Sequence, residues 1–281
     1  MAFGRGPLSH PLLTDAIENA FVPLAVNNRP GTDGGLLERY EEPQYNNPVV
    51  RYFAPDGDEL LKRKDRVWTS AETADRMVGA LRAGDYEVPG YLRIAQAELS
   101  TKLHERAVFG MHCFWQGQAA FGRLDGVLEA KPGWMDGGEV VEVRFDPRVI
   151  DFETLVRTAQ KSECARRVFV EDAALPEARR LVGDAADRIE GATRDAKPSD
   201  DLYHLNRSPL RYLPLTRLQA LRINGDLEAR GSGERWLSPS QTELLSAIRS
   251  APKDRLDGLR RPEELGELAA YEKRLRARLD G

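Results

Sequence analysis

One short stretch of the chain holds the residues best able to do chemistry. Residues 110–115 read GMHCFW and contain Cys113, one of only two cysteines in 281 residues. A cysteine attacks as its thiolate, and a free thiol with a pKa of about 8.5 is mostly protonated at neutral pH. At the N-terminal end of a helix, unpaired backbone N–H groups and the helix dipole stabilise the anion. The reactivity of Cys113 therefore depends on the elements that surround it.

The sequence around Cys113 predicts strands and helices in the order β-α-β-β-α-β. Apolar runs and alternation indicate the strands, and apolar residues at helical spacing indicate the helices. The expected ranges are a strand at 105–111, a helix at 113–124, strands at 127–134 and 139–147, a helix at 151–162 and a strand at 165–170. Asp151 is the expected N-cap of the second helix. This order is the split βαβ of ferredoxin-like folds, and it places Cys113 where the first helix begins.

The same stretch resembles a known enzyme family. The residues FGMHCFW, followed later by EVVEVRFDP before a helix, are similar to peptide methionine sulfoxide reductase A, whose Gly-Cys-Phe-Trp opens the same helix. The resemblance covers residues 107–160 and implies that Cys113 attacks the sulfur of a sulfoxide. It further implies that Phe114 and Trp115 enclose the S-methyl group. Glu139 becomes the acid that protonates the sulfoxide oxygen.

The chemistry that the resemblance implies is coherent. Attack of a thiolate on sulfur needs a proton for the oxygen, and a carboxylic acid held protonated in an apolar pocket can supply it. The cysteine is left as a sulfenic acid, which a second thiol converts into a disulfide. The resemblance implies no cofactor and no metal, a methionine sulfoxide peptide or a small sulfoxide as substrate, and an external thiol reductant such as thioredoxin.

The chain departs from the family's pattern around the expected site. Trp134 stands where the family has a tyrosine that contacts the sulfoxide oxygen, and Gly137-Gly138 lead straight into Glu139 where the family has a loop. Cys164 takes the place of an aspartate, and a second tyrosine is absent. Because the family's aspartate reaches the oxygen site, the resemblance places Cys164 near Cys113. It thus predicts a disulfide or the resolution of a sulfenic acid, with a coincidental buried cysteine as the alternative.

The first segment, residues 1–88, predicts a separate domain. Its pattern reads helix, strand, helix, strand, strand and helix, with elements that include 12–20, 21–26, 47–60 and 71–84. This order resembles a thioredoxin-like domain, with Pro48 where that fold carries a cis-proline. The first strand and the Cys-x-x-Cys of that fold are missing. Either the domain has lost redox chemistry and kept its fold, or Met1 lies downstream of the true start.

Residues 89–171 form the expected sulfoxide-reductase-type domain, and residues 172–281 form a charged helical extension. Apolar residues recur at helical spacing in four stretches of the extension, 175–192, 215–230, 238–250 and 262–279. Ser238 is the expected N-cap of the third, with Pro239 at its first helical position. We expect the extension to pack on the sheet domain, and an independent binding module is the alternative. The fold class is therefore α/β (α+β).

Composition restricts the location and the partners. The chain has 41% hydrophobic, 31% charged and 7% aromatic residues, which is typical of a soluble globular protein. Its net charge of −4 is spread along the chain and argues against nucleic acid or an anionic membrane as partner. No apolar run of about 18 residues and no signal peptide is recognisable, so a cytoplasmic location is expected. The four histidines show no metal-ligand spacing.

Three functions remain open from the sequence. The first is a thiol-dependent redox enzyme that resembles peptide methionine sulfoxide reductase A, with Cys113 as nucleophile and Glu139 as acid. The second is a catalytically silent two-domain scaffold or protein-binding module that keeps only the fold. The third is an enzyme that uses the same cysteine and glutamate on a smaller substrate or a thiol conjugate.

Overall fold

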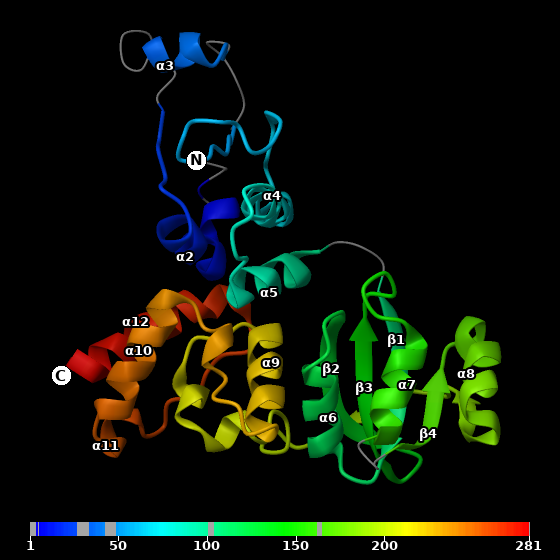
Figure 1. The fold of residues 1–281 in the computed structure, drawn as a ribbon. Helices are drawn as coiled ribbons and strands as arrows, with labels where there is room; N and C mark the ends of the chain where they lie inside the picture. The colour runs from blue at the N-terminus through cyan, green and yellow to red at the C-terminus, as the bar shows by residue number, and fades with distance from the viewer. Residues whose placement is uncertain are drawn as a thin grey trace. The chain divides into compact units, whose positions relative to one another are not determined.

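The computed structural model of the chain describes residues 4, 6–26, 34–42, 49–100, 104–161 and 165–280. The chain divides into two compact units, residues 1–101 and 102–281. All strands of the described part belong to the second unit (Figure 1). None of the helices in the described part is both long and apolar enough to cross a membrane.

The first unit is built from helices. They are α2 (Pro11–Asn19), α3 (Gly34–Arg39), α4 (Ser70–Ala83) and α5 (Gly90–Leu99), with a short 3-10 turn before α2. Both α2 and α4 pack on α5 through buried apolar side chains such as Leu13, Met77 and Ile94. The helices expected at 12–20 and 71–84 are confirmed, and Gly84 ends α4 as the sequence predicts. Since α5 packs on α2 and α4, the first unit extends beyond residue 88.

The strand expected at 21–26 is not formed. These residues pair with no strand in the described part of the chain, and Val22 and Leu24 are 97% and 75% exposed. A strand needs a neighbour to pair its backbone groups, and Pro23 lacks the N–H that pairing requires. An apolar run alone therefore gave the wrong prediction here.

The expected hairpin at 47–60 is reduced to two isolated bridges, Val50 with Lys64 and Phe53 with Glu59. Its turn is present, with Gly57 at a φ of +95° that glycine adopts without strain. Without a sheet in the described residues of this unit, the thioredoxin-like fold is unsupported. Pro48 lies outside the described residues.

The second unit contains one six-stranded sheet in the order β5-β4-β1-β3-β2-β6. Its strands are β1 (Glu105–Met111), β2 (Val127–Met135), β3 (Gly138–Phe145), β4 (Ala165–Val170), β5 (Ala186–Arg188) and β6 (Arg194–Asp195). Every pair is antiparallel except β4 with β5. With α6 (Phe114–Gly122) after β1 and α7 (Phe152–Lys161) after β3, the predicted β-α-β-β-α-β order is confirmed.

Helices α6 and α7 cover one face of the sheet. The ring of Phe109 on β1 lies 4.8 Å from that of Phe121 on α6 and 6.3 Å from that of Phe152 on α7, centre to centre. Side chains two residues apart on a strand share a face, so Met111 faces the helices as well. The register pairs Met111 with Glu139, which places Glu139 on this face too.

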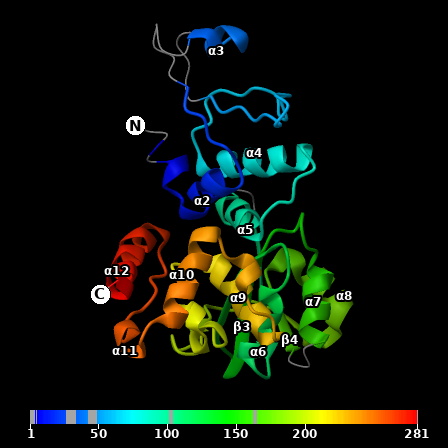
Figure 2. The ribbon, with the colours of Figure 1, turned by 60° about the vertical axis from the view of Figure 1, so that its left-hand side comes forward.

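The rest of the chain belongs to the same unit as the sheet. Its helices are α8 (Leu175–Val182), α9 (Arg217–Glu228), α10 (Pro239–Ser250), α11 (Lys253–Leu256) and α12 (Leu268–Asp280). Helix α9 packs on α6, as Figures 1 and 2 both show. A Cβ on Gly225 would lie only 2.6 Å from the carbonyl oxygen of Ala119, so the two helices approach closely. Ser238 caps α10 and Pro239 is its first residue, as predicted.

This region contains two short strands, β5 and β6, in addition to the expected helices. The helical pattern at 175–192 ends at Val182, because Gly183 turns the chain away with φ +60° and ψ −132°. The residues that follow add β5 and β6 to the two edges of the sheet. Strands of three and two residues are too short to show alternation, which is why the pattern did not reveal them.

Candidate active site

Cys113 is the N-cap residue of α6, directly after β1. Its backbone is extended, with φ −141° and ψ 110°, and its side chain accepts no hydrogen bond from the helix. The thiol is free and partly buried. The sequence prediction that Cys113 opens this helix is confirmed.

Glu139 reaches the same helix start from the neighbouring strand. Its Oε2 accepts a hydrogen bond of 2.8 Å from the backbone N–H of Phe114, the first residue of α6. Across the sheet, Glu139 pairs with Met111 on one side and with Trp134 on the other. The carboxyl group therefore binds the residue next to Cys113 and takes the place of a side-chain N-cap.

Three aromatic side chains lie around this helix start. The Phe114 ring is buried and meets the Trp134 ring edge to face, with centres 5.7 Å apart and planes at 78°. The centre of the Trp115 ring lies 6.1 Å from that of Phe114. Strands β2 and β3 are joined only by Asp136 and Gly137, so Trp134 and Glu139 are direct neighbours without an intervening loop.

The structure thus brings together five of the six residues singled out from the sequence. Cys113, Phe114, Trp115, Trp134 and Glu139 share the N-terminal end of α6. The sixth, Cys164, lies outside the described residues. No group of three or more histidine, cysteine, aspartate or glutamate side chains that could hold a metal ion occurs among the residues that the structure describes.

Tyr203 also contacts the site, and sequence reasoning missed it. Its ring stacks on Trp115, with centres 4.0 Å apart and planes at 21°. The residue lies in a turn between β6 and α9, far along the chain from α6. No local pattern marks such a contact, because it exists only through the packing of distant segments.

Helix α6 is held at its other end by a buried arginine. Arg222 of α9 is 3% exposed and donates hydrogen bonds to the carbonyl oxygens of Gly122, at 2.7 Å, and Val127, at 2.9 Å. A cation near the last carbonyls of a helix also suits the helix dipole. Glu139 and Arg222 therefore fix the two ends of the helix that begins after Cys113.

Comparison with known proteins gives partial matches. No protein-family model matches the chain. It is 35% identical over 78 residues to peptide methionine sulfoxide reductase A5 of Oryza sativa subsp. japonica, which is 23% of this chain and 31% of that protein. It is 36% identical over 70 residues to peptide methionine sulfoxide reductase MsrA of Methanothermobacter thermautotrophicus, which is 19% of this chain and 41% of that protein. It is 32% identical over 75 residues to the MsrA of Methanococcus maripaludis, which is 21% of this chain and 48% of that protein.

One region of the chain is therefore similar to peptide methionine sulfoxide reductase A. The chain spans less than half the length of these curated relatives.

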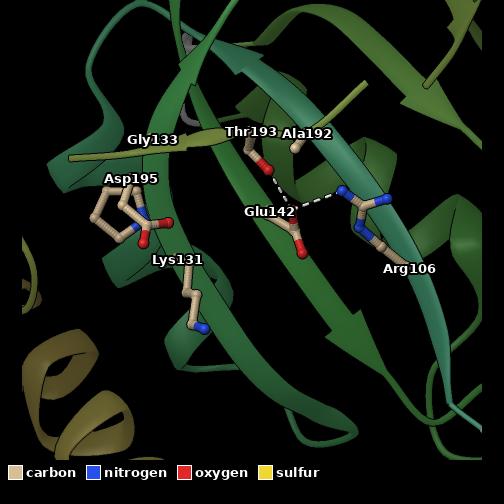
Figure 3. Close-up of a pocket in the computed structure, with 8 residues that line it drawn as sticks. Arg106, Lys131, Gly133, Glu142, Ala192, Thr193 and Asp195 are labelled. Carbon is tan, nitrogen blue, oxygen red and sulfur yellow. Dashed lines mark hydrogen bonds and ion pairs between the residues drawn. The ribbon is translucent and has the colours of Figure 1, made fainter. Parts of the chain in front are cut away.

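A separate pocket of about 270 Å³ lies on the opposite face of the sheet. Figure 3 shows Glu142 between Arg106 and Thr193, both of which donate hydrogen bonds to it. The bond from Arg106 is the main reason that the pKa of Glu142 is lowered from its usual value. Glu142 alternates with the residues of β3 that face the helices, and its charge is paired within the protein. This pocket is thus distinct from the site around Cys113.

Proposed function

We propose that this chain is a thiol-dependent sulfoxide reductase of the methionine sulfoxide reductase A type. The observation that carries the proposal is the 2.8 Å hydrogen bond between Phe114 and Glu139, which puts a carboxyl group at the helix start that Cys113 caps. Reduction of a sulfoxide needs a nucleophile for sulfur and a proton for oxygen, and this pair offers both. The partial similarity to the curated reductases supports the same chemistry.

In the proposed reaction the sulfur of Cys113 attacks the sulfur of the sulfoxide, and Glu139 gives its proton to the oxygen. A bond between the two sulfur atoms forms first. The hydroxyl group then moves from the substrate's sulfur to the sulfur of Cys113, so that the substrate's S–O bond and the new S–S bond both break. Cys113 is left as a sulfenic acid, and the substrate leaves as a thioether. The proton of the original thiol replaces the one that Glu139 gave. One thiol and one sulfoxide thus yield one sulfenic acid and one thioether.

The aromatic side chains would form the binding surface for the substrate. Phe114, Trp115 and Trp134 supply apolar walls beside the thiol, which suit a methyl group bound to sulfur. Because only a two-residue turn joins β2 and β3, no loop between these two strands covers the site next to Trp134. The proposed substrates are therefore a methionine sulfoxide in an exposed peptide or a small methyl sulfoxide.

Cys164 is proposed as the resolving thiol. Its neighbour in the chain, Ala165, pairs with Met111, two residues before Cys113. Attack of Cys164 on the sulfenic acid would release water and form a disulfide, which a thioredoxin-type dithiol would reduce. A cytoplasmic location, where thiols are kept reduced, fits this cycle.

The test is reduction of methyl p-tolyl sulfoxide and N-acetylmethionine sulfoxide by the full chain, with dithiothreitol as the reductant. We expect activity in the wild type, none in Cys113→Ser, and retained activity in the matched Cys164→Ser variant, since dithiothreitol reduces a sulfenic acid directly. A wild-type protein that reduces neither substrate, and whose Cys113 is alkylated no faster than free cysteine, would contradict the proposal. That result would favour the scaffold interpretation.

A further inference from the structure

Trp115, Tyr203 and Arg207 form a column beside the candidate site. The Tyr203 ring stacks on Trp115 with centres 4.0 Å apart, and the guanidinium carbon of Arg207 lies 3.3 Å from the centre of the Tyr203 ring. The indole and the guanidinium are too close to the Tyr203 ring to lie on the same face of it. Arg207 therefore covers the face opposite Trp115. Arg207 also donates a hydrogen bond of 3.1 Å to the carbonyl oxygen of Tyr203. Both faces of the tyrosine are therefore occupied.

The turn that carries Tyr203 is fixed by buried amide side chains. Gln118 of α6 accepts a hydrogen bond of 2.9 Å from the N–H of Leu202, and Asn224 of α9 accepts one of 2.9 Å from the N–H of His204. Gln118 and Asn224 are both 0% exposed. Leu202 adopts φ +51°, which residues other than glycine rarely do unless their surroundings hold them there. The position of the Tyr203 ring is thus set by the fold around it.

Trp115 depends on this ring for its own position. The indole Nε1 of Trp115 is buried and has no hydrogen-bond partner among the described residues, although a buried tryptophan N–H usually finds one. No polar contact therefore fixes the rotation of the indole through its N–H. Among the ring contacts of Trp115 in the described residues, the stacking on Tyr203 is the closer, with centres 4.0 Å apart against 6.1 Å for Phe114.

We propose that Tyr203 is a positioning residue that fixes Trp115 and thereby makes the site select methyl sulfoxides over sulfoxides with larger alkyl groups. The inference rests on the proposed function, in which Trp115 is a wall of the cage for the methyl group. A wall that cannot move leaves no room for an added carbon, and one methylene in an apolar pocket changes specificity by about 10- to 200-fold. Tyr203 acts through Trp115 and takes no part in the chemical step.

The first test compares kcat/KM for methyl and isopropyl p-tolyl sulfoxide in three variants of the full chain. We expect Tyr203→Ala to lower the methyl-to-isopropyl ratio by about tenfold or more. Tyr203→Phe keeps the stacking and should keep the ratio. Tyr212→Ala is the matched control, because an arginine, Arg211, also lies over the Tyr212 ring, 4.5 Å from its centre. The ratio is independent of the folded fraction, so an unchanged ratio in Tyr203→Ala would overturn the proposal.

The second test needs no catalysis. Hydrogen exchange of the indole N–H groups is followed by NMR, with Trp115→Phe identifying the signal of Trp115 and the other tryptophans as internal controls. We expect Tyr203→Ala to accelerate exchange at Trp115 alone. Unchanged exchange would overturn the positioning role. Accelerated exchange in a protein whose wild type reduces no sulfoxide would confirm the positioning, and would overturn the selectivity together with the proposed function.

Discussion

Glu139 on β3 accepts a hydrogen bond of 2.8 Å from the backbone N–H of Phe114, the residue that follows Cys113. A carboxylate at this place and a thiolate on Cys113 would draw on the same positive end of α6. In the proposed reaction the two groups act together, with Cys113 as the nucleophile and Glu139 as the source of the proton.

The first prediction concerns the charge of Glu139. Glu139→Gln keeps an oxygen that can accept from Phe114 but removes the negative charge and the proton source. We expect faster alkylation of Cys113 by iodoacetamide at pH 7 and slower sulfoxide reduction, by about 10²- to 10⁴-fold. Glu142→Gln, on the opposite face of the sheet, is the control. Opposite changes in the two rates would be hard to explain by unfolding, whereas two unchanged rates would exclude Glu139 from the reaction.

The second prediction concerns the resolving thiol. Wild-type protein treated with one equivalent of sulfoxide and no reductant should lose two hydrogens and give a peptide in which Cys113 is joined to Cys164. In Cys164→Ser the sulfenic acid on Cys113 should persist and be trapped by dimedone, as mass spectrometry would detect. A disulfide between two chains, or a dimedone adduct in the wild type, would show that Cys164 does not resolve Cys113.

The third prediction tests the contact between α6 and α9. A Cβ on Gly225 would lie 2.6 Å from the backbone oxygen of Ala119, which cannot move aside without shifting α6. We expect Gly225→Ala to lower the free energy of unfolding by about 1–3 kcal/mol, as overpacking does. Gly266→Ala is the control, because nothing lies within 4 Å of its Cβ position. Equal midpoints of urea unfolding for both variants would contradict the close packing.

A fourth prediction follows from a buried histidine in the first unit. Burial lowers the pKa of His10 from 6.5 to about 4, and the residue is 3% exposed. The folded state therefore binds the proton more weakly than the unfolded state does. The stabilisation is fully present above pH 6.5 and is lost as the pH falls towards 4, by up to about 3 kcal/mol.

Amide hydrogen exchange of α2, corrected for its intrinsic pH dependence, would measure this loss between pH 7 and 4.5. His10→Gln, which does not titrate in this range, should remove the pH dependence, whereas replacement of the exposed His112 should leave it unchanged. An equal pH dependence in wild type and His10→Gln would show that another group is responsible.

Much of the sheet around Cys113 was predictable from the sequence, because strong periodicity and local capping agree there. Strands β1 and β4 have the expected bounds, and α6 begins directly after Cys113. Asp151 caps α7 as expected, accepting a hydrogen bond of 2.7 Å from the N–H of Thr154. In each case the signal lies within a few residues and does not depend on a distant partner.

The features that were missed depend on distant partners. Residues 21–26 are apolar enough for a strand but have no neighbouring strand to pair with in the described part of the chain. The strand predicted from their composition is therefore not formed. The stacking of Tyr203 on Trp115 requires the turn between β6 and α9 to be folded onto α6. Likewise, the hydrogen bond from Phe114 to Glu139 depends on the register between β1 and β3, which cannot be predicted from a local motif.

The most direct test of the central claim is a single turnover. Reduced Cys164→Ser protein is mixed with excess methyl p-tolyl sulfoxide in the absence of any reductant, and the thioether and the dimedone-trapped Cys113 are both counted. The account predicts one thioether and one modified Cys113 for each active chain, and neither in the Cys113→Ser, Cys164→Ser double variant. Thioether formation without modification of Cys113, or no thioether at all, would contradict it.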